Sequence, residues 1–222
     1  MQLSPGSILQ AQALLFDMDG TLVDSTAVVI KVWRRFAARH GLDAELILAD
    51  SHGRRTEDTV AAFATAGMDV AAEAAQVTAE EIADRDGIVE VPGAAALLAQ
   101  LPHSRWAVVT SASRELATTR ILAAGLPLPK VLICAEDVGH GKPAPDGYLA
   151  AAAALGIAPA NCLVFEDARA GLDAGHAAGM QVVALATTLP VEALGAECWI
   201  RDYRAVQIRM DADGIALQRT PA

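Results

Sequence analysis

The sequence predicts an α/β fold in which a parallel sheet has helices on both faces and a helical cap is inserted after the first strand. Three observations support this prediction. From Val91 onward, short apolar runs alternate with stretches of helical periodicity, which is typical of strands joined by helical crossovers. From Ser25 to about Val89, the periodicity is helical throughout. One apolar run precedes both regions and ends abruptly in Asp-x-Asp-Gly-Thr at residues 17–21.

Composition and charge are those of a folded protein that does not bind polyanions. Of the 222 residues, 53% are hydrophobic and 20% are charged, which is typical of a globular chain. The net charge of −10 argues against nucleic acid or an anionic membrane as partner, so an anionic substrate has to be captured by local positive charge. No run of about 18 apolar residues is present, and no membrane span is expected.

The predicted compartment is the cytoplasm. The first ten residues contain no Lys or Arg, which argues against a signal peptide. The three cysteines are far apart and lack the CxxC spacing, so we interpret them as small buried hydrophobes in a reducing compartment. We expect a monomer or a weak homodimer.

The chain starts with a leader, residues 1–12, in which we find no informative pattern, and continues into the first predicted strand, Ala13–Phe16. Helical spacing begins at Thr26, with Asp24 or Ser25 as the expected N-cap. A loop, residues 51–55, precedes two further helices. The predicted helices of this region begin at Thr26, Thr56 and Asp69 and end near residues 40, 63 and 86.

Strands and helices alternate between residues 94 and 185, and glycines mark several helix ends. The predicted helices span 94–101, 114–124, 148–155 and a stretch that ends at 178. The predicted strands span 106–109, 131–134, 163–165 and 182–185. A terminal hairpin of residues 206–210 and 215–217 is joined by Asp213-Gly214.

This order predicts two domains. A Rossmann-like catalytic core comprises residues 1–23 and 90–222, and a helical cap domain comprises residues 24–89. The hinges are expected near Val23-Asp24 and near Glu90-Pro92. A cap that lies over the carboxyl edge of the sheet can exclude water and contact the substrate.

Four loops that follow four predicted strands carry chemically useful side chains. The carboxyl ends of parallel strands meet at one edge of a sheet, so these loops are expected to lie together. Gly20 allows the sharp turn after the first strand, where a side chain would clash. The side chains are those of Asp17 and Asp19, Ser111, Lys142, and Glu166 and Asp167.

Four carboxylates at one edge repel one another, since two unit charges about 4 Å apart cost roughly 1–4 kcal/mol at effective dielectrics of 80 to 20. A hard divalent cation with oxygen ligands removes this cost, and Mg²⁺ is the natural choice. The plausible ligands are Asp17, Asp167 and a carbonyl near Asp19, with Glu166 supporting them from behind or through water. The alternative is that Glu166 and Asp167 only cap the following helix.

Lys142 and Ser111 are predicted to bind a phosphoryl group. Lys142 is one of three lysines and can offset the charge that a phosphoryl group brings to a site lined by carboxylates. The Ser111 hydroxyl can donate a hydrogen bond to a phosphoryl oxygen. The segment is not a Walker A loop, because Pro143 stands where that motif needs Ser or Thr. A solvated lysine and a helix-capping serine are the alternatives.

These motifs resemble those of a known family. DMDGTLVDS, the Ser111 loop, GKPAPD and FEDARAG are similar, in the same order, to the four motifs of the haloacid dehalogenase superfamily. The resemblance is to its phosphatase and phosphomutase branch, with a helical cap after the first motif. It is nearest to sugar- and polyol-phosphate phosphatases, such as 2-deoxyglucose-6-phosphate and glycerol-3-phosphate phosphatases, and it covers nearly the whole chain after the leader.

The resemblance implies a role for each motif residue. Asp17 would be the nucleophile that forms an aspartyl-phosphate, and Asp19 would protonate the leaving oxygen and then activate water. The phosphoryl group would be held by Ser111, Ala112 and Lys142. Mg²⁺ would be bound by Asp17, Asp19 and Asp167, with Glu166 behind them. The substrate would be a small phosphorylated metabolite, and His52, Arg54 and Arg55 of the cap would contact it, unless this loop is simply a solvated basic segment.

The alternatives are other activities of the same branch. Mutases that resemble β-phosphoglucomutase have a His in the first cap helix, and here none precedes His40. Phosphonate hydrolysis needs a cap lysine, and the cap offers only Lys31. Dehalogenases lack the acid that is present here as Asp19. A non-catalytic binding protein should have lost a catalytic residue, and none is missing. Hydrolysis of a phosphate ester is therefore the predicted activity.

Overall fold

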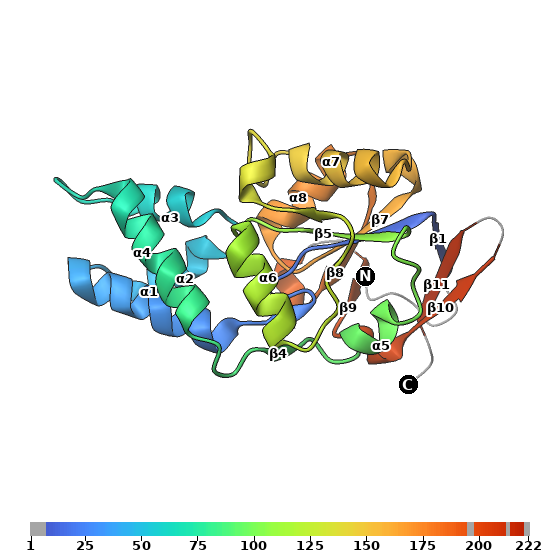
Figure 1. Cartoon of the computed structure of the whole chain (residues 1–222), viewed down its shortest axis with the longest axis horizontal. Coiled ribbons are helices and arrows are strands. Elements are labelled where there is room, and N and C mark those ends of the chain that lie inside the picture. Colours follow the sequence, from blue (N-terminus) through green and yellow to red (C-terminus); the bar gives the residue numbers. More distant parts are fainter. Residues whose placement is uncertain (1–7, 195–197, 212–213, 220–222) are drawn as a thin grey trace.

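The computed structural model describes residues 8–194, 198–211 and 214–219. Within these residues, a central sheet of six parallel strands has the order β6-β5-β2-β7-β8-β9 (Figure 1). Its strands are β2 (Ala13–Phe16), β5 (Trp106–Val109), β6 (Leu132–Ile133), β7 (Cys162–Glu166), β8 (Gln181–Leu185) and β9 (Cys198–Ile200). The predicted α/β class is confirmed, and the strand that carries the Asp-x-Asp-Gly-Thr motif lies in the middle of the sheet.

Helices cover both faces of this sheet, as predicted. Successive side chains of β2 point to opposite faces, and all four are buried. Leu14 and Phe16 pack with the helices of one face, and Ala13 and Leu15 pack with those of the other. The first face is covered by α5 (Ala94–Leu98) and α6 (Arg114–Ala123), and the second by α7 (Asp146–Leu155) and α8 (Arg169–Ala177).

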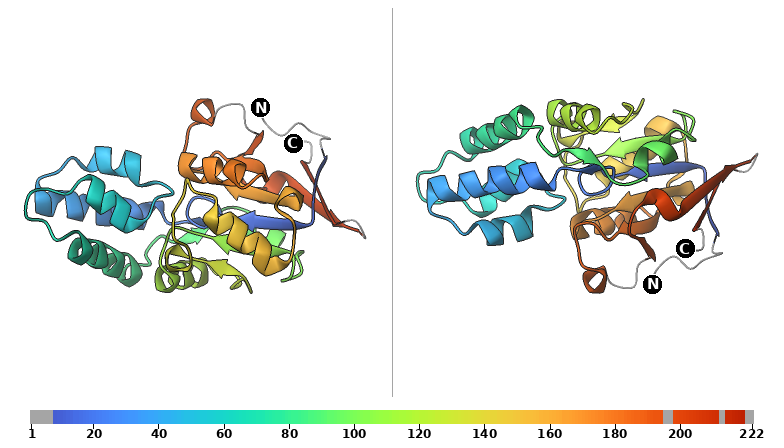
Figure 2. Two further views of the ribbon diagram at one scale, coloured as in Figure 1. Left: turned by 90° about the horizontal axis from the view of Figure 1, so that it is seen from above. Right: turned by 90° about the horizontal axis from the view of Figure 1, so that it is seen from below.

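The inserted helices form a separate layer beside the core (Figure 2). They are α1 (Thr26–His40), α2 (Ala44–Ser51), α3 (Thr56–Ala62) and α4 (Val70–Ala83). The chain enters and leaves them through a short antiparallel pair, β3 (Val23–Asp24) and β4 (Val89–Glu90), at the places predicted for the hinges. Helix α2 was not predicted from the sequence, because its apolar residues have little helical periodicity. The exact domain boundaries stay a prediction.

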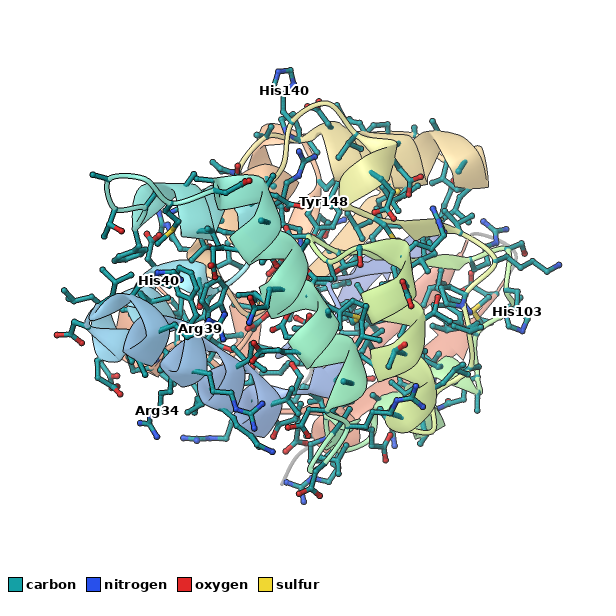
Figure 3. The ribbon with its side chains drawn as sticks, turned by 60° about the vertical axis from the view of Figure 1, so that its left-hand side comes forward. Arg34, Arg39, His40, His103, His140 and Tyr148 are labelled. Atoms are coloured by element: carbon teal, nitrogen blue, oxygen red, sulfur yellow. The ribbon has the colours of Figure 1, made fainter. Side chains whose placement is uncertain are left out.

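Charged residues at the end of α1 tie the cap helices together (Figure 3). Arg39 pairs with Glu80 of α4 at 2.7 Å, and His40 Nε2 lies 3.0 Å from a Glu73 oxygen on the same helix. Beneath them, α1 buries an apolar face that includes Val32. This face continues the hydrophobic cluster that also contains Leu14 and Phe16 of β2.

A second, smaller sheet closes the end of the core opposite the cap. Its central strand β11 (Ile215–Arg219) pairs with β10 (Val206–Met210) and with β1 (Ile8–Ala11), all antiparallel. The terminal hairpin is thus confirmed, although Asp213 of its turn lies outside the described residues. The leader contains a strand that the sequence did not reveal, and β9 was also missed, because both are short and gain stability from long-range pairing.

The remaining elements are short. Helix α5 ends at Leu98, three residues before the predicted end. Single 3₁₀ turns span Ala135–Asp137, Pro159–Asn161, Val191–Ala193 and Tyr203–Ala205. Among the helices of the described ranges, none combines the length and apolar character needed to cross a bilayer.

Adjacent residues of α6 test the packing of this helix on the sheet. Ile121 is 1% exposed in the core, whereas Leu122 is 56% exposed. Ile121→Ala should lower the free energy of unfolding by about 2–5 kcal/mol, because it leaves a cavity. Leu122→Ala should change it by less than about 0.5 kcal/mol. Urea unfolding followed by circular dichroism measures both, and equal losses would contradict the orientation that α6 has in the structure.

Candidate active site

The loops at the carboxyl edge of the sheet converge on a buried ammonium group. Lys142 Nζ contacts Asp17 Oδ1, lies 2.5 Å from Glu166 Oε1 and donates to the Val109 carbonyl oxygen at 3.1 Å. These partners come from the ends of β2, β7 and β5. The structure thus brings the loop that carries Lys142 together with the ends of three other strands, at the edge predicted from the sequence.

Two glycines leave room for the acids of this cluster. Gly20 has φ +77°, and a Cβ there would lie 2.1 Å from Asp167 Oδ2, so the turn after β2 requires glycine. On α8, a Cβ at Gly171 would lie 1.7 Å from Glu166 Oε1. The glycines of the first and last motifs are therefore explained by the close approach of carboxylates.

Three of the carboxylates form a compact group. Oxygen atoms of Asp17, Glu166 and Asp167 lie within 4.8 Å of one another, and all three residues are buried. Burial, and then the charge of Glu166, raise the pKa of Asp17 well above its usual value and that of Asp167 to about 7. The group is electrostatically costly when no cation is bound, which fits a site for a hard divalent ion.

The hydrogen bonds of Glu166 distinguish it from Asp17 and Asp167. Glu166 Oε1 accepts from Lys142 and from the Tyr148 hydroxyl at 2.9 Å, and Oε2 accepts from the backbone N–H groups of Asp167 and Ala168 at 3.1 and 3.3 Å. Its oxygens are therefore engaged in holding the lysine and the loop. Asp17 and Asp167 are the side chains that could bind a metal ion directly.

Asp19 points away from this group. Its Oδ1 accepts from Ser25 Oγ at 2.6 Å, and its Oδ2 pairs with Arg120 at 2.8 Å. Its side chain is thus not one of the three gathered around the candidate metal position. The predicted contribution of a carbonyl near Asp19 stays a prediction.

The predicted phosphate-binding residues lie beside the acids. Ser111 and Ala112 line the same cavity as Asp17. Ser111 Oγ donates to the Gly53 carbonyl oxygen of the cap at 2.8 Å, and the Ala112 N–H donates to Thr110 Oγ1 at 3.1 Å. A bound phosphoryl group would have to replace Gly53 as the acceptor for Ser111.

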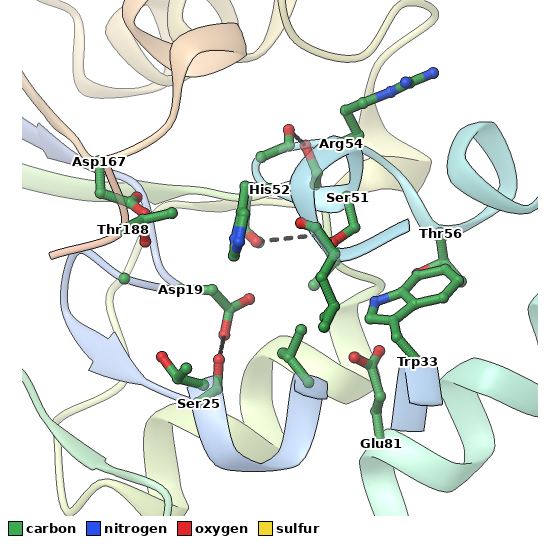
Figure 4. Close-up of a pocket in the computed structure, with 18 of the residues that line it drawn as sticks. Asp19, Ser25, Trp33, Ser51, His52, Arg54, Thr56, Glu81, Asp167 and Thr188 are labelled. Atoms are coloured by element: carbon green, nitrogen blue, oxygen red, sulfur yellow. Dashed lines mark hydrogen bonds between the residues drawn. The ribbon is translucent and has the colours of Figure 1, made fainter. Parts of the chain in front are cut away.

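A cavity of about 280 Å³ lies between the cap and the core (Figure 4). It is close to the lower end of the range for ligand pockets, about 300–1,000 Å³, which suits a small metabolite. Core residues that line it include Asp17, Asp19, Ser111, Ala112, Arg120 and Asp167. Cap residues that line it include Trp33, Glu45, Ser51, His52, Arg54, Thr56 and Glu81.

The three predicted cap contacts differ in position. His52 lines the cavity, and burial lowers its pKa although the charge of Asp19 acts in the opposite direction. Arg54 belongs to the cavity wall, but its guanidinium pairs with Asp50 and points away from Asp19 in Figure 4. The structure does not bring Arg55 to the cavity.

Arg55 instead ties the cap loop to the core. Its Nη2 donates to the carbonyl oxygens of Ala135 and Val138 at 3.0 and 2.8 Å. Together with the bond between Ser111 and Gly53, these contacts hold the cap on the core.

Two buried cavity residues were missed by the sequence analysis. Arg120 and Glu81 face each other across the boundary between core and cap, 2.9 Å apart. The signal for Arg120 was its place one helical turn after Leu116, on a face of α6 that is otherwise apolar. A charged residue at a core position points to a buried partner.

Comparisons with known proteins agree with the family resemblance. A family model described as haloacid dehalogenase-like hydrolase matches residues 11–179. Hexitol phosphatase A of Escherichia coli is 44% identical over 80% of this chain and 84% of its own. Glycerol-1-phosphate phosphohydrolase 2 of Saccharomyces cerevisiae is 36% identical over 90% and 86%. The structure of CbbY from Rhodobacter sphaeroides in complex with phosphate superposes with a TM-score of 0.76 at 25% identity, covering 87% of this chain and 95% of that one.

The acid cluster predicts that Mg²⁺ stabilises the fold. A ligand present at 100 times its Kd that binds only the folded state adds about 2.7 kcal/mol. For a chain of this size, such a gain should raise the Tm by about 5–11 °C. Asp167→Asn removes one candidate ligand, so most of the increase in Tm caused by Mg²⁺ should be lost. It also removes one buried charge, so the Tm in EDTA should not fall.

Thermal unfolding with Mg²⁺ and with EDTA measures both effects. The matched control is Asp173→Asn, which changes a partly exposed acid of α8 that pairs with Arg169. It should keep the full response to Mg²⁺. An undiminished response of Asp167→Asn would mean that the ion binds elsewhere.

Proposed function

Since the chain belongs to the haloacid dehalogenase-like hydrolase family, we propose that it is a phosphatase for a small sugar or polyol phosphate, with Asp17 as nucleophile and Mg²⁺ as cofactor. The observation that carries the proposal is the convergence of Asp17, Lys142 and Asp167 at the sheet edge, beneath a cavity closed by the cap. The names of the relatives, which include a hexitol phosphatase and a glycerol-1-phosphate phosphohydrolase, support the class of substrate.

The proposed reaction has two steps. In the first, a carboxylate oxygen of Asp17 attacks phosphorus, and the bond to the sugar oxygen breaks as that oxygen takes a proton from Asp19. In the second, Asp19 takes a proton from water, which attacks phosphorus and releases phosphate and the Asp17 carboxylate. When bound, Mg²⁺ would offset the negative charge that gathers on the phosphoryl oxygens and the acids.

Lys142 supplies fixed positive charge at the same place. Burial alone would lower its pKa, but Asp17 and Glu166 raise it above the usual value for lysine. The ammonium therefore stays charged at the pH of any cell. Its contact with Asp17 puts it where it can offset the charge of a phosphoryl group carried by that residue.

The lining of the cavity supports a substrate with one phosphate and an otherwise neutral body. Arg54 and Arg55 are already engaged, by Asp50 and by core carbonyl groups. His52 offers ring nitrogens that suit hydroxyls, and the volume suits a small polyol.

The mutase and phosphonate alternatives are not supported by the cap. His40 lies at the end of α1 and is bound to Glu73, and no other His is present on this helix. Lys31 pairs with Asp84 at 2.5 Å, and it is not among the residues that line the cavity. Neither side chain is available for phosphoryl return or for a Schiff base in this arrangement.

Replacement of the nucleophile tests the mechanism. Asp17→Asn should lower kcat/KM for glycerol 1-phosphate and hexitol phosphates by more than about 10³-fold, because an amide cannot form the acyl-phosphate. The Tm should not fall, since one buried charge is removed. Asp173→Asn should retain full activity with Mg²⁺. Turnover by Asp17→Asn would rule out the assigned nucleophile.

His52 tests recognition by the cap. His52→Ala should lower kcat/KM for sugar and polyol phosphates by about 3- to 10-fold, the loss expected for one hydrogen bond. Activity on p-nitrophenyl phosphate should change less, because its leaving group has no hydroxyls to bind. The control is His140→Ala, whose side chain is 82% exposed and projects away from the body of the protein (Figure 3). Equal losses on both substrates would show that His52 does not contact the sugar or polyol part of the substrate.

A further inference from the structure

One buried guanidinium joins the acid–base candidate of the core to the cap. Arg120 lies on core helix α6, with its side chain only 4% exposed. Its Nη1 pairs with Asp19 Oδ2 at 2.8 Å, and its Nη2 pairs with Glu81 Oε1 at 2.9 Å. Glu81 belongs to cap helix α4 and is also buried. The bridge therefore crosses the boundary between the two layers.

We propose that Arg120 is a positioning residue that fixes the Asp19 carboxylate for proton transfer only while Glu81 holds the guanidinium from the cap. The inference rests on the proposed function, in which Asp19 protonates the leaving oxygen. It adds a device by which closure of the cap controls the orientation of that acid.

Both oxygens of Asp19 depend on the cap. Oδ1 accepts from Ser25, the N-cap residue of α1, where the cap begins. Ser25 makes no capping bond with its side chain, so its hydroxyl is free to hold Asp19. Oδ2 is held by Arg120, which shares its charge with Glu81. With Ser25 and Arg120 in place the carboxylate cannot rotate, whereas movement of α1 would release Ser25, and movement of α4 would take Glu81 away from Arg120.

The arrangement of charges favours the closed cap. Burial raises the pKa of Glu81, and the neighbouring charge of Arg120 opposes that rise. A guanidinium presents its donors in a planar fork, so it can serve two carboxylates at once without moving. When the cap lifts, Glu81 loses its partner, and Arg120 is left with Asp19 and water. The guanidinium, no longer held from the cap, is then free to turn, and its hold on Asp19 is no longer fixed in direction.

Dependence on the leaving group reports the position of Asp19. An alkoxide leaves slowly unless it receives a proton, so hydrolysis of an alkyl phosphate needs a correctly placed acid. p-Nitrophenolate leaves without one. Because kcat/KM covers the steps up to the release of the alcohol, the ratio of kcat/KM for propyl phosphate, an alkyl ester with no hydroxyl to bind, to that for p-nitrophenyl phosphate isolates this requirement.

The experiment compares Arg120→Met, Glu81→Gln and the double variant with two matched controls. Arg114→Met removes another arginine of α6, which pairs with Asp137 outside the cavity. Glu80→Gln changes the residue beside Glu81. Glu80 forms ion pairs with Arg35 and Arg39, and these stay within the cap. Both controls should keep the kcat/KM ratio of the unmodified protein.

Arg120→Met should lower kcat/KM for the alkyl ester by about 100-fold and for the aryl ester by less than about tenfold, given the size of general acid effects. Glu81→Gln should change the ratio in the same direction by a smaller factor. The double variant should be no worse than Arg120→Met, because residues of one network are not additive.

Equal losses on the two esters, or losses that multiply in the double variant, would overturn the inference. Arg120→Met leaves Glu81 buried without its partner; if this variant does not fold, the ratio in the double variant, which removes both charges, decides. An unchanged ratio there also overturns the inference. An unmodified protein that hydrolyses neither ester would contradict the proposed function and the inference with it, whereas equal losses in an active enzyme contradict the inference alone.

Discussion

The buried contact of Lys142 with Asp17 and Glu166 is the interaction on which the rest of the site depends. Three buried acids share one ammonium, so their ionised forms carry more negative charge than the lysine offsets. Burial of unpaired charge is costly, and such a cluster persists only where the surrounding fold holds it in place. The cost is what makes the site receptive to a divalent cation and to chemistry on a phosphoryl group.

The surrounding fold supplies that restraint from several directions. The backbone N–H groups at the start of the β7–α8 loop hold Glu166, and the Tyr148 hydroxyl fixes it from α7. Thr21 donates to Asp167 at 3.0 Å. Strand β2, buried on both faces, fixes the position of Asp17. The central position of β2 in the sheet therefore contributes both to the packing of the core and to the placement of the acids.

The sequence predicted those parts of the molecule whose signal is local. Alternation of apolar runs and helical faces located β2, β5, β7 and β8, and the rule that parallel strands present their carboxyl ends at one edge brought Asp17, Lys142 and Glu166 together. Strands β1 and β9 depend on partners far away in the sequence. Arg55 looked like a substrate contact, but its hydrogen-bonding partners are core carbonyl groups that no local pattern reveals. Arg120 was missed because its partners lie on other elements.

The β3–β4 pair makes the cap a modular insertion. Val23 is the register partner of Glu90, and Asp24 is that of Val89, so the chain leaves the core and returns to it at neighbouring positions. Antiparallel strands in this register can be closed by a two-residue turn. The sheet therefore does not need the 64 residues between these strands for its connectivity. A different cap joined to the same two strands would bring other residues to the cavity, while the pairing of β2 with β5 and β7 would stay the same.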